Sequence, residues 1–344
     1  MKRNWKKQIA LCLSFLLLNG MFAACDTEST LATEPAPTEP DGEAKVLKIL
    51  TLGSSSSVDA CHMLNLILAT EGIGAYDEVI VGTLYYSGCK LHEHVRFLTQ
   101  DADVYRLYLS SSKTPEKAPN TMDNVTMKTA LTFDYWDIIF LQAGGVETDK
   151  DETFTNGNIQ TIQNYVNQHK RNPLAIFGYH FTGIPATDPD LMYSYPYSPN
   201  GYEIAYAKYH NDRMAYYNAR AAMIEKYIFT DETIDLKICS ITAIMNAETS
   251  YLTEKDLYRD YTHSTDLGRV MTAYVWYCRL MGVEQLEEVK LDAIPRQFLK
   301  STVDKTQDRP ITDAEKVIIL ESVNNALKNP LQVTNSQHTE PPAQ

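Results

Sequence analysis

Residues 46–57 read VLKILTLGSSSS, a stretch in which a hydrophobic run meets a turn of small residues. The seven residues 46–52 are rich in Val, Leu and Ile and predict a short, largely buried β-strand. Gly53 and the serines after it predict a tight turn from this strand into a helix. Backbone N–H groups at a helix start converge on one point, so a serine here can act as a nucleophile. A simple helix cap is the common alternative for such a serine run.

Four further hydrophobic runs follow, with helical patterns between or after them. Strands that alternate with helices predict right-handed βαβ units and therefore a parallel sheet covered on both faces. We predict an α/β fold, a three-layer α/β/α sandwich of flavodoxin-like type with a central parallel sheet. Functional residues in such sheets gather at the carboxyl ends of the strands. The predicted strands are 46–52, 77–84, 136–142, 173–180 and 236–242, and the predicted helices are 58–70, 158–168, 202–229 and 265–281.

A second chemical signal is the segment YRDYTH at residues 258–263, directly before the last long predicted helix. Asp260 and His263 are three residues apart on one loop and can meet. The carboxylate would then fix the tautomer of the imidazole and stabilise its charged form. Such a pair also occurs by chance in many chains, so its meaning depends on what accompanies it.

Together these segments resemble blocks I and V of the SGNH (GDSL-like) hydrolases, which have a Gly-x-Ser turn after the first strand and Asp-x-x-His before the last helix. A closer resemblance is to the bacterial DUF4886 family, a domain of unknown function. Its members show, in order, G-N-S-F-S, G-G-C-S-L-x-x-H, W-D-I-V-x-L-Q and D-G-x-H. The corresponding segments here are GSSSS (53–57), SGCKLHEH (87–94), WDIIFLQ (136–142) and DYTH (260–263).

The resemblance implies a catalytic triad. Ser55 aligns with the nucleophile, His263 with the general base, and Asp260 with the acid that orients the base. Ser54 replaces the usual Asn or Asp, and Ser56 replaces an aromatic residue, so the pocket beside the nucleophile is altered. Neither departure removes a group that transfers a proton.

The resemblance also implies an oxyanion site. Gly88, in the block II segment, aligns with a residue whose backbone N–H binds the oxyanion, together with the N–H of Ser55. Gln142 stands where block III has an Asn, and its side-chain NH₂ could donate to the same oxygen. We expect no metal and no organic cofactor for this chemistry.

Three histidines allow other interpretations. His92 and His94 suggest a metal site, but two residues apart on a helix they point to different faces, and no third ligand is evident. His94 matches the histidine of the family, and His180 ends the fourth predicted strand. Both are candidates for lining the substrate pocket, although a hydrogen-bonded structural role fits His180 equally well.

Composition restricts the partners. The 344 residues carry a formal net charge of -13, which argues against a nucleic-acid partner because phosphate binding needs a basic surface. Several of the 22 tyrosines lie in MYSYPY at 192–197 and along 202–227. They could form an aromatic platform for sugar rings, or they could simply cover the sheet and the helix interface.

The N-terminus predicts export. Residues 1–7 are basic, 9–22 are largely apolar, and Ala23-Ala24-Cys25 follows, which resembles the lipobox of bacterial lipoproteins. The resemblance implies a lipid on Cys25 and a protein anchored at the bacterial cell membrane or surface by that lipid alone. An ordinary signal peptide cut after Ala24 is the alternative.

The four cysteines after Cys25 have no metal-ligand spacing, and we expect buried free thiols.

The predicted organisation of the chain follows from the targeting segment and from the polar segments. The predicted parts are a signal peptide (1–24), a disordered acidic tether (25–45), an SGNH hydrolase-like domain (46–285), a C-terminal helical extension (286–328) and a disordered tail (329–344).

The predicted function is that of an extracytoplasmic serine ester hydrolase that removes acyl groups, such as acetyl, from carbohydrate or another small ester. The alternative is a catalytically silent glycan-binding lipoprotein on the same fold. Keeping the Ser, Asp and His together favours the enzyme, because a binding protein gains little from all three.

Overall fold

The computed structural model describes residues 44–144, 148–192, 207–291 and 311–342. The predicted signal peptide, Cys25 and nearly all of the predicted tether lie outside these residues, as do the tyrosines of 193–197. Within the described ranges, no helix has both the length and the apolar character needed to cross a membrane.

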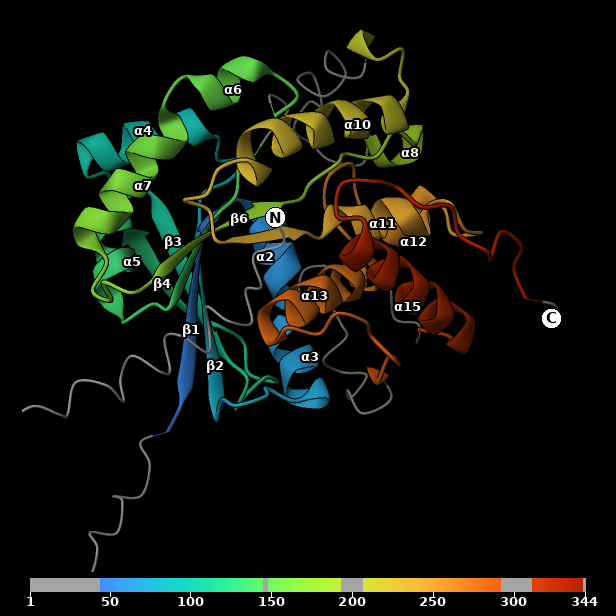
Figure 1. Cartoon of the computed structure of the whole chain (residues 1–344), viewed down its shortest axis with the longest axis horizontal. Coiled ribbons are helices and arrows are strands. Elements are labelled where there is room, and N and C mark those ends of the chain that lie inside the picture. Colours follow the sequence, from blue (N-terminus) through green and yellow to red (C-terminus); the bar gives the residue numbers. More distant parts are fainter. Residues whose placement is uncertain (1–43, 145–147, 193–206, 292–310, 343–344) are drawn as a thin grey trace, which may run out of the picture. The chain divides into compact units, whose positions relative to one another are not determined.

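A seven-stranded sheet forms the centre of the fold, in the order β4-β3-β2-β1-β5-β6-β7 (Figure 1). Five strands are parallel, whereas β3 pairs antiparallel with β2, and β4 antiparallel with β3. The carboxyl ends of the parallel strands therefore share one edge of the sheet. The strands are β1 (Val46–Gly53), β2 (Glu78–Tyr85), β3 (Tyr105–Ser111), β4 (Asn120–Val125), β5 (Ile138–Leu141), β6 (Ile176–Phe181) and β7 (Leu236–Cys239).

Helices cover both faces of the sheet, which makes three layers (Figure 1). On one face α4 (Leu91–Gln100), α5 (Met127–Phe133) and α7 (Asn158–His169) pack together. On the other, α13 (Asp266–Met281) packs against α2 (Ser55–His62) and α3 (Leu64–Glu71), with α11 (Ile241–Ala247) and α15 (Asp313–Lys328) beyond it. The remaining helices are α6 (Asp151–Thr155), α8 (Pro189–Met192), α10 (Arg213–Ile224), the π-helix η1 (Glu225–Phe229) and α12 (Glu254–Leu257).

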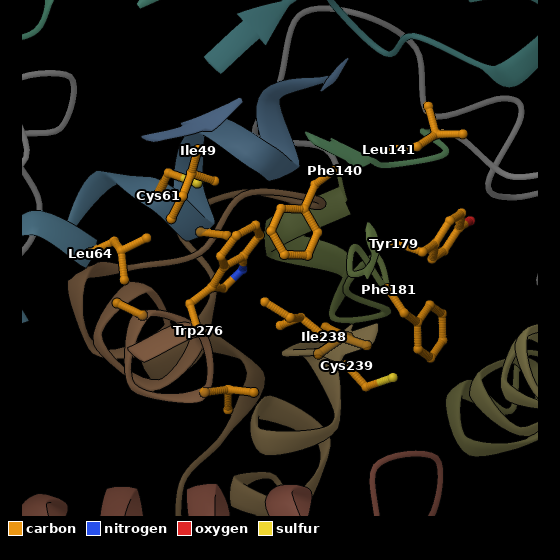
Figure 2. Packing of buried hydrophobic residues seen from close by; sticks show 14 of the residues in the cluster. Ile49, Cys61, Leu64, Phe140, Leu141, Tyr179, Phe181, Ile238, Cys239 and Trp276 are labelled. Atoms are coloured by element: carbon orange, nitrogen blue, oxygen red, sulfur yellow. The ribbon is translucent and has the colours of Figure 1, made fainter. Parts of the chain in front are cut away.

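A large part of the core lies between the sheet and α13. Trp276 of α13 is fully buried and packs against Phe140 of β5, with ring centroids 4.5 Å apart (Figure 2). Ile49 of β1 and Ile238 of β7 are also fully buried in this cluster. Burial of such side chains is worth about 1.5–3 kcal/mol each, so this contact fixes α13 and the loop before it on the sheet.

The predicted fold class is confirmed, with five of the seven strands close to their predicted positions. The antiparallel pair β3 and β4 was not predicted. In β4 only Val125 is buried, so the strand has no hydrophobic run that a sequence pattern could detect. An edge strand exposed in this way is polar because it faces solvent.

Element boundaries differ from the prediction in three places. Of the helix predicted over 202–229, the long described part is α10, which begins only at Arg213, followed by the π-helix η1. The helix predicted over 58–70 is two helices, α2 and α3, which meet at Met63. The strand predicted over 236–242 ends at Cys239, and the apolar residues after it begin α11. Short apolar runs do not distinguish a strand from a buried helix, which explains why the end of β7 was predicted wrongly.

The prediction of a disordered tail is wrong for the residues described. Thr334 N–H donates to Asn246 at 2.8 Å, and Ser336 N–H donates to Thr249 Oγ1 at 2.7 Å. Polar side chains of α11 and the turn after it thus hold the segment. Composition predicted disorder because the tail is polar and contains proline, but these hydrogen bonds and the packing of Leu331 and Val333 against the core hold it in place. The preceding α15, in the predicted helical extension, buries Ile318 and Ile319.

Candidate active site

The predicted triad and oxyanion residues come from segments at the carboxyl edge of the sheet. Ser54 and Ser55 follow β1, Gly88 follows β2, and Gln142 follows β5. The loop with Asp260 and His263 precedes α13, which Trp276 anchors on the sheet. Topology therefore collects residues that are 200 positions apart in the chain at one edge.

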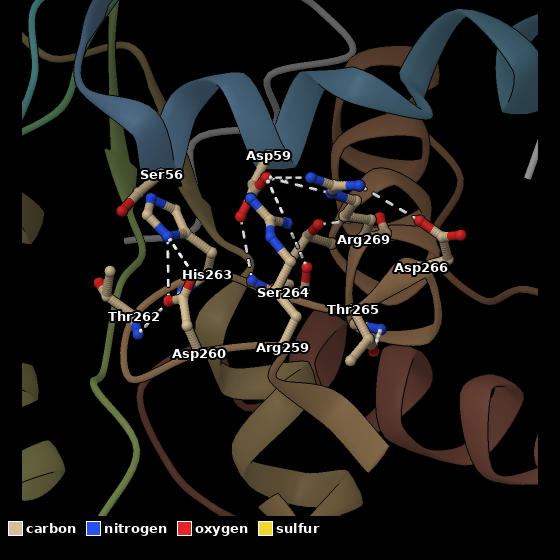
Figure 3. A network of polar contacts seen from close by, with 12 residues as sticks. Ser56, Asp59, Arg259, Asp260, Thr262, His263, Ser264, Thr265, Asp266 and Arg269 are labelled. Atoms are coloured by element: carbon tan, nitrogen blue, oxygen red, sulfur yellow. Dashed lines mark hydrogen bonds and ion pairs between the residues drawn. The ribbon is translucent and has the colours of Figure 1, made fainter. Parts of the chain in front are cut away.

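Asp260 and His263 form a hydrogen-bonded pair (Figure 3). The Nδ1 of His263 lies 2.8 Å from Oδ2 and 3.0 Å from Oδ1 of Asp260. The backbone N–H groups of Thr262 and His263 also donate to Oδ1, each at 2.9 Å. The backbone of its own loop thus positions the carboxylate for its hydrogen bond with the imidazole.

Electrostatics keeps Asp260 ionised. Burial alone would raise its pKa, but the hydrogen bond from His263, the charge of that ring and two backbone N–H donors hold the pKa below its ordinary value. An ionised carboxylate accepts a hydrogen bond from Nδ1–H, and in that tautomer the imidazole presents the lone pair of Nε2. That arrangement is the one a general base requires.

The serine turn is fixed by Gln142. Its Oε1 accepts hydrogen bonds from Ser54 N–H at 2.9 Å, from the Ser54 hydroxyl at 2.9 Å and from the Ser57 hydroxyl at 3.2 Å. Gly53 is required here, because a Cβ at this position would lie 2.7 Å from Gln142 Oε1. Gln142 is 1% exposed, so the end of β5 and the start of α2 form one rigid unit.

This geometry also orients the Gln142 amide. A backbone N–H can only donate, so the atom that faces Ser54 is the oxygen, and the NH₂ group points elsewhere. The amide group is therefore placed by the serine turn itself. Its donation to an oxyanion remains a prediction.

Ser55 stands at the first position of α2 and is half-buried. Its N–H belongs to the first turn, whose donors have no partner within the helix. The next residue, Ser56, lines a cavity of about 10 Å³ together with Thr262 and Ser264. In Figure 3 the imidazole of His263 lies between Asp260 and Ser56. The start of α2 thus borders the His263 loop, whereas direct pairing of Ser55 Oγ with His263 stays a prediction.

Sequence reasoning missed Asp59, which joins α2 to the His263 loop (Figure 3). Its Oδ2 accepts from Ser264 N–H at 3.0 Å, and its Oδ1 accepts from Arg259 Nη1 at 3.2 Å. Arg269 of α13 donates to the same Oδ1 from Nε at 3.0 Å and from Nη2 at 2.8 Å. The only signal in the sequence is an acid one helical turn after Ser55.

The charge of Asp59 is sustained by these arginines. Burial would raise its pKa, but Arg269, Arg259 and His263 together hold the pKa below its ordinary value. Burial disfavours the charge of Arg269 in turn, and Asp59 and Asp266 outweigh it and raise the pKa of the guanidinium. An ionised, buried network therefore fixes the loop on the nucleophile helix.

Gly88 has a φ of 62°, a conformation that favours glycine. Apart from its two chain neighbours, no described residue has an atom within 4 Å of the position that a Cβ would take there. Cys89, the next residue, is held from the other side, because its carbonyl accepts from Gly144 N–H at 2.8 Å. This turn after β2 is therefore open at Gly88 and supported at Cys89.

The two histidines proposed for the substrate pocket are buried. His94 is 0% exposed, and its Nδ1 lies 2.8 Å from the hydroxyl of Tyr105. His180 is 1% exposed, and its Nε2 contacts Ser240 Oγ at 2.7 Å and accepts from Trp276 at 3.2 Å. Burial lowers the pKa of both to about 3, so both stay neutral. Each packs in the core, which argues against direct contact with substrate.

The remaining sequence features are the histidine pair of α4 and the cysteines. In α4 His92 is exposed and His94 is buried, so they face opposite sides. Among the residues that the structure describes, no group of three or more His, Cys, Asp or Glu could hold a metal ion. The four described cysteines are free and buried: Cys61, Cys89, Cys239 and Cys278.

A family model and one solved structure of that family agree with this architecture. The family model described as "Domain of unknown function (DUF4886)" matches residues 48–297. A DUF4886 family protein from Bacteroides uniformis has a similar structure, with a TM-score of 0.66 and 22% identity, covering 85% of this chain and 98% of that one. A protein from Slackia heliotrinireducens, described as "a putative SGNH hydrolase", aligns with a TM-score of 0.38 and 16% identity over 69% of this chain and 100% of its own. No curated protein matches the chain.

Proposed function

Because this chain belongs to the DUF4886 family, whose function is unknown, we propose a function from its own geometry: an exported serine ester hydrolase that removes acyl groups from carbohydrate. Its main support is the Asp260–His263 pair, in which an ionised carboxylate holds Nδ1 at 2.8 Å. The pair lies on a loop that Asp59 ties to the helix beginning with Ser55.

In the proposed reaction His263 Nε2 takes the proton of the Ser55 hydroxyl as its oxygen attacks the ester carbonyl. The oxyanion is bound by the N–H groups of Ser55 and Gly88 and by the Gln142 amide. His263 then protonates the leaving alcohol, and an acyl-enzyme remains. A water attacks the acyl-enzyme and gives one proton to His263, which passes it to the Ser55 oxygen as the acid leaves, so that the hydroxyl and the neutral base are restored.

The placement of Gln142 matters for this mechanism. One oxyanion donor is commonly worth roughly 3 kcal/mol of barrier. Gln142 is longer than the Asn of block III, and its amide oxygen accepts three hydrogen bonds from the serine turn. The longer side chain can thus support the turn and still offer its NH₂ group.

The test is acetate release from p-nitrophenyl acetate and from acetylated polysaccharides. Ser55→Ala should lower kcat by at least about 10⁵-fold, since loss of a nucleophile removes the whole catalytic unit. Ser56→Ala is the matched control, one residue along the same helix turn, and should keep most activity. Near wild-type turnover by Ser55→Ala would disprove the assignment, and loss confined to Ser56→Ala would move the nucleophile by one residue.

A further inference from the structure

The segment SGCKLHEH (87–94) supplies two buried residues that the proposed reaction leaves without a role. Cys89 and His94 are both 0% exposed. The Nδ1 of His94 lies 2.8 Å from the hydroxyl of Tyr105, and the two rings stack with centroids 5.8 Å apart. Tyr105 belongs to β3 and is 1% exposed, so a buried polar pair joins α4 to β3.

The pair continues to the turn that carries Gly88. The hydroxyl of Tyr105 also hydrogen-bonds the thiol of Cys89. Burial raises the pKa of this thiol, so it keeps its proton. The thiol donates a hydrogen bond to the carbonyl of Lys90, with 3.8 Å between sulfur and oxygen. One chain of contacts therefore runs from His94 through Tyr105 and Cys89 to the backbone of that turn.

Burial also sets the direction of these hydrogen bonds. The Nε2 of His94 is buried and has no hydrogen-bond partner among the described residues. A neutral imidazole carries a single proton, and a buried N–H without an acceptor is rarer than an acceptor without a donor. The proton is therefore assigned to Nδ1, which donates it to Tyr105. Tyr105 can then donate to Cys89, so that the polar hydrogens of the chain all point toward the turn.

The position of Gly88 is set through Cys89. Gly88 has a φ of 62°, and apart from its two chain neighbours no described residue has an atom within 4 Å of the position of a Cβ there. The backbone of Cys89 is held on both sides, because its N–H donates to the Tyr86 carbonyl at 3.3 Å and its carbonyl accepts from Gly144 N–H at 2.8 Å. Its thiol adds the contact with Tyr105, which ties the turn to β3 and α4.

We propose that His94, Tyr105 and Cys89 are positioning residues that hold the Gly88 N–H where the oxyanion of the ester forms. This inference rests on the proposed function, which gives Gly88 that role. All three side chains are buried in the core, so they act through the turn and not on the substrate. The oxyanion exists only in the tetrahedral state of the reaction, so displacement of the Gly88 N–H lowers kcat and leaves KM unchanged.

Tyr105→Phe tests the chain at its middle. The change removes the hydroxyl but keeps the ring that packs on Tyr86 and Phe97. We expect kcat for p-nitrophenyl acetate to fall about tenfold with KM unchanged, because complete loss of an oxyanion donor costs roughly 10²–10³ and a displaced donor costs less. Tyr108→Phe, on the same strand, is the matched control and should keep wild-type turnover, because its hydroxyl belongs to an exposed contact with Arg106. A kcat for Tyr105→Phe within about twofold of wild type, or a loss that appears only in KM, would overturn the proposal.

Cys89 provides a rescue that separates positioning from packing. Cys89→Ala removes the thiol and should lower kcat as much as Tyr105→Phe does, at a temperature where circular dichroism shows both variants folded. Cys89→Ser keeps a donor and an acceptor at the same place and should regain most of this loss. The double variant Tyr105→Phe, Cys89→Ala should be no worse than either single variant, because one chain can be broken only once. Losses that add, or no gain from serine, would show that the two side chains only fill the core.

Hydrogen exchange separates this inference from the esterase itself. Amide exchange across residues 86–90, followed by mass spectrometry, should be faster in Tyr105→Phe than in wild type, whereas β1 and β5 should exchange as before. Faster exchange in a protein that hydrolyses no ester would keep the support of the turn and refute the proposed function. Unchanged exchange in Tyr105→Phe would overturn the inference, even where the wild type hydrolyses esters and the proposed function stands.

Discussion

Replacing Asp59 by Asn tests the network that joins the nucleophile helix to the His263 loop. The change keeps the size of the side chain but removes its charge and puts an NH₂ group where one oxygen was. Asp59 now accepts four hydrogen bonds, from Ser264 N–H, Arg259 and twice from Arg269. An amide has one oxygen, so it must face either the loop N–H or the guanidinium groups with a donor.

The expected cost follows from the burial of the partner. The Arg269 side chain is 4% exposed and, among the described residues, would keep Asp266, at 3.2 Å, as its one acidic partner. Breaking a buried ion pair commonly costs 3–5 kcal/mol, and the remaining acid puts Arg269 near the lower limit, about 3 kcal/mol. For a domain of this size that corresponds to a fall in Tm of roughly 6–10 °C.

The assay is thermal unfolding followed by circular dichroism at several pH values. Asp59 has a lowered pKa, so its stabilising effect is fully present above the ordinary value of 3.8 and is lost as the pH falls through the lower folded value. The difference in Tm between wild type and Asp59→Asn should therefore be constant near neutral pH and shrink in acid. Asp151→Asn, which breaks the exposed pair with Lys226, is the control and should leave Tm unchanged.

A Tm for Asp59→Asn within about 1 °C of wild type at pH 7 would refute this reasoning, because breaking a buried ion pair should lower the free energy of unfolding by more than that shift allows. The same variant should also lose esterase activity at a temperature where it is folded. Asp59 accepts a hydrogen bond from the N–H of Ser264, the residue directly after His263. Loss of this hydrogen bond would leave the catalytic base less firmly positioned.

Two other predictions concern the dyad and the anchor. Asp260→Asn should lower kcat by roughly 10⁴-fold, less than Ser55→Ala, because the serine and the base remain but the tautomer is no longer fixed; activity equal to wild type would show that the pair is structural. Cys25→Ser should move the protein out of the membrane fraction or leave it unprocessed, since stable anchoring needs two acyl chains. Mass spectrometry that found an unmodified residue 25 in the mature protein would favour the free secreted form.

Those parts of the fold and of the site could be predicted that leave a pattern in the sequence near the residues concerned. The buried parallel strands carry continuous apolar runs, so their positions in the chain, the parallel sheet and the edge that holds the site could be inferred before any coordinates. Asp260 and His263 are three residues apart, so their contact is local and the spacing alone indicated it. By contrast, β4 and the tail after α15 are polar segments that gain their order from partners elsewhere, and composition is silent about such partners.

Asp59 shows why part of the site could not be predicted. Its partners Arg259, Ser264 and Arg269 lie 200 or more positions away, and nothing in the local pattern of α2 separates it from a surface acid. His94 and His180 show the opposite case, in which a pocket position was considered and the structure shows burial in the core; for His180 this is the structural role that the sequence had left open. Each is near a strand end or a motif, which suggested a pocket, but side-chain direction and burial are decided by packing.

The serine run itself shows how the departures from the family pattern are accommodated. Where the family has Asn or Asp and an aromatic residue, this chain has Ser54 and Ser56. Ser54 caps α2 and, with Ser57, donates to Gln142, so the short hydroxyls complete a network centred on one amide oxygen. Since that amide is oriented by the turn that precedes Ser55, the expected oxyanion donor and the expected nucleophile are positioned by the same hydrogen bonds. A change in either Ser54 or Ser57 should therefore be felt at Ser55 and at Gln142 together.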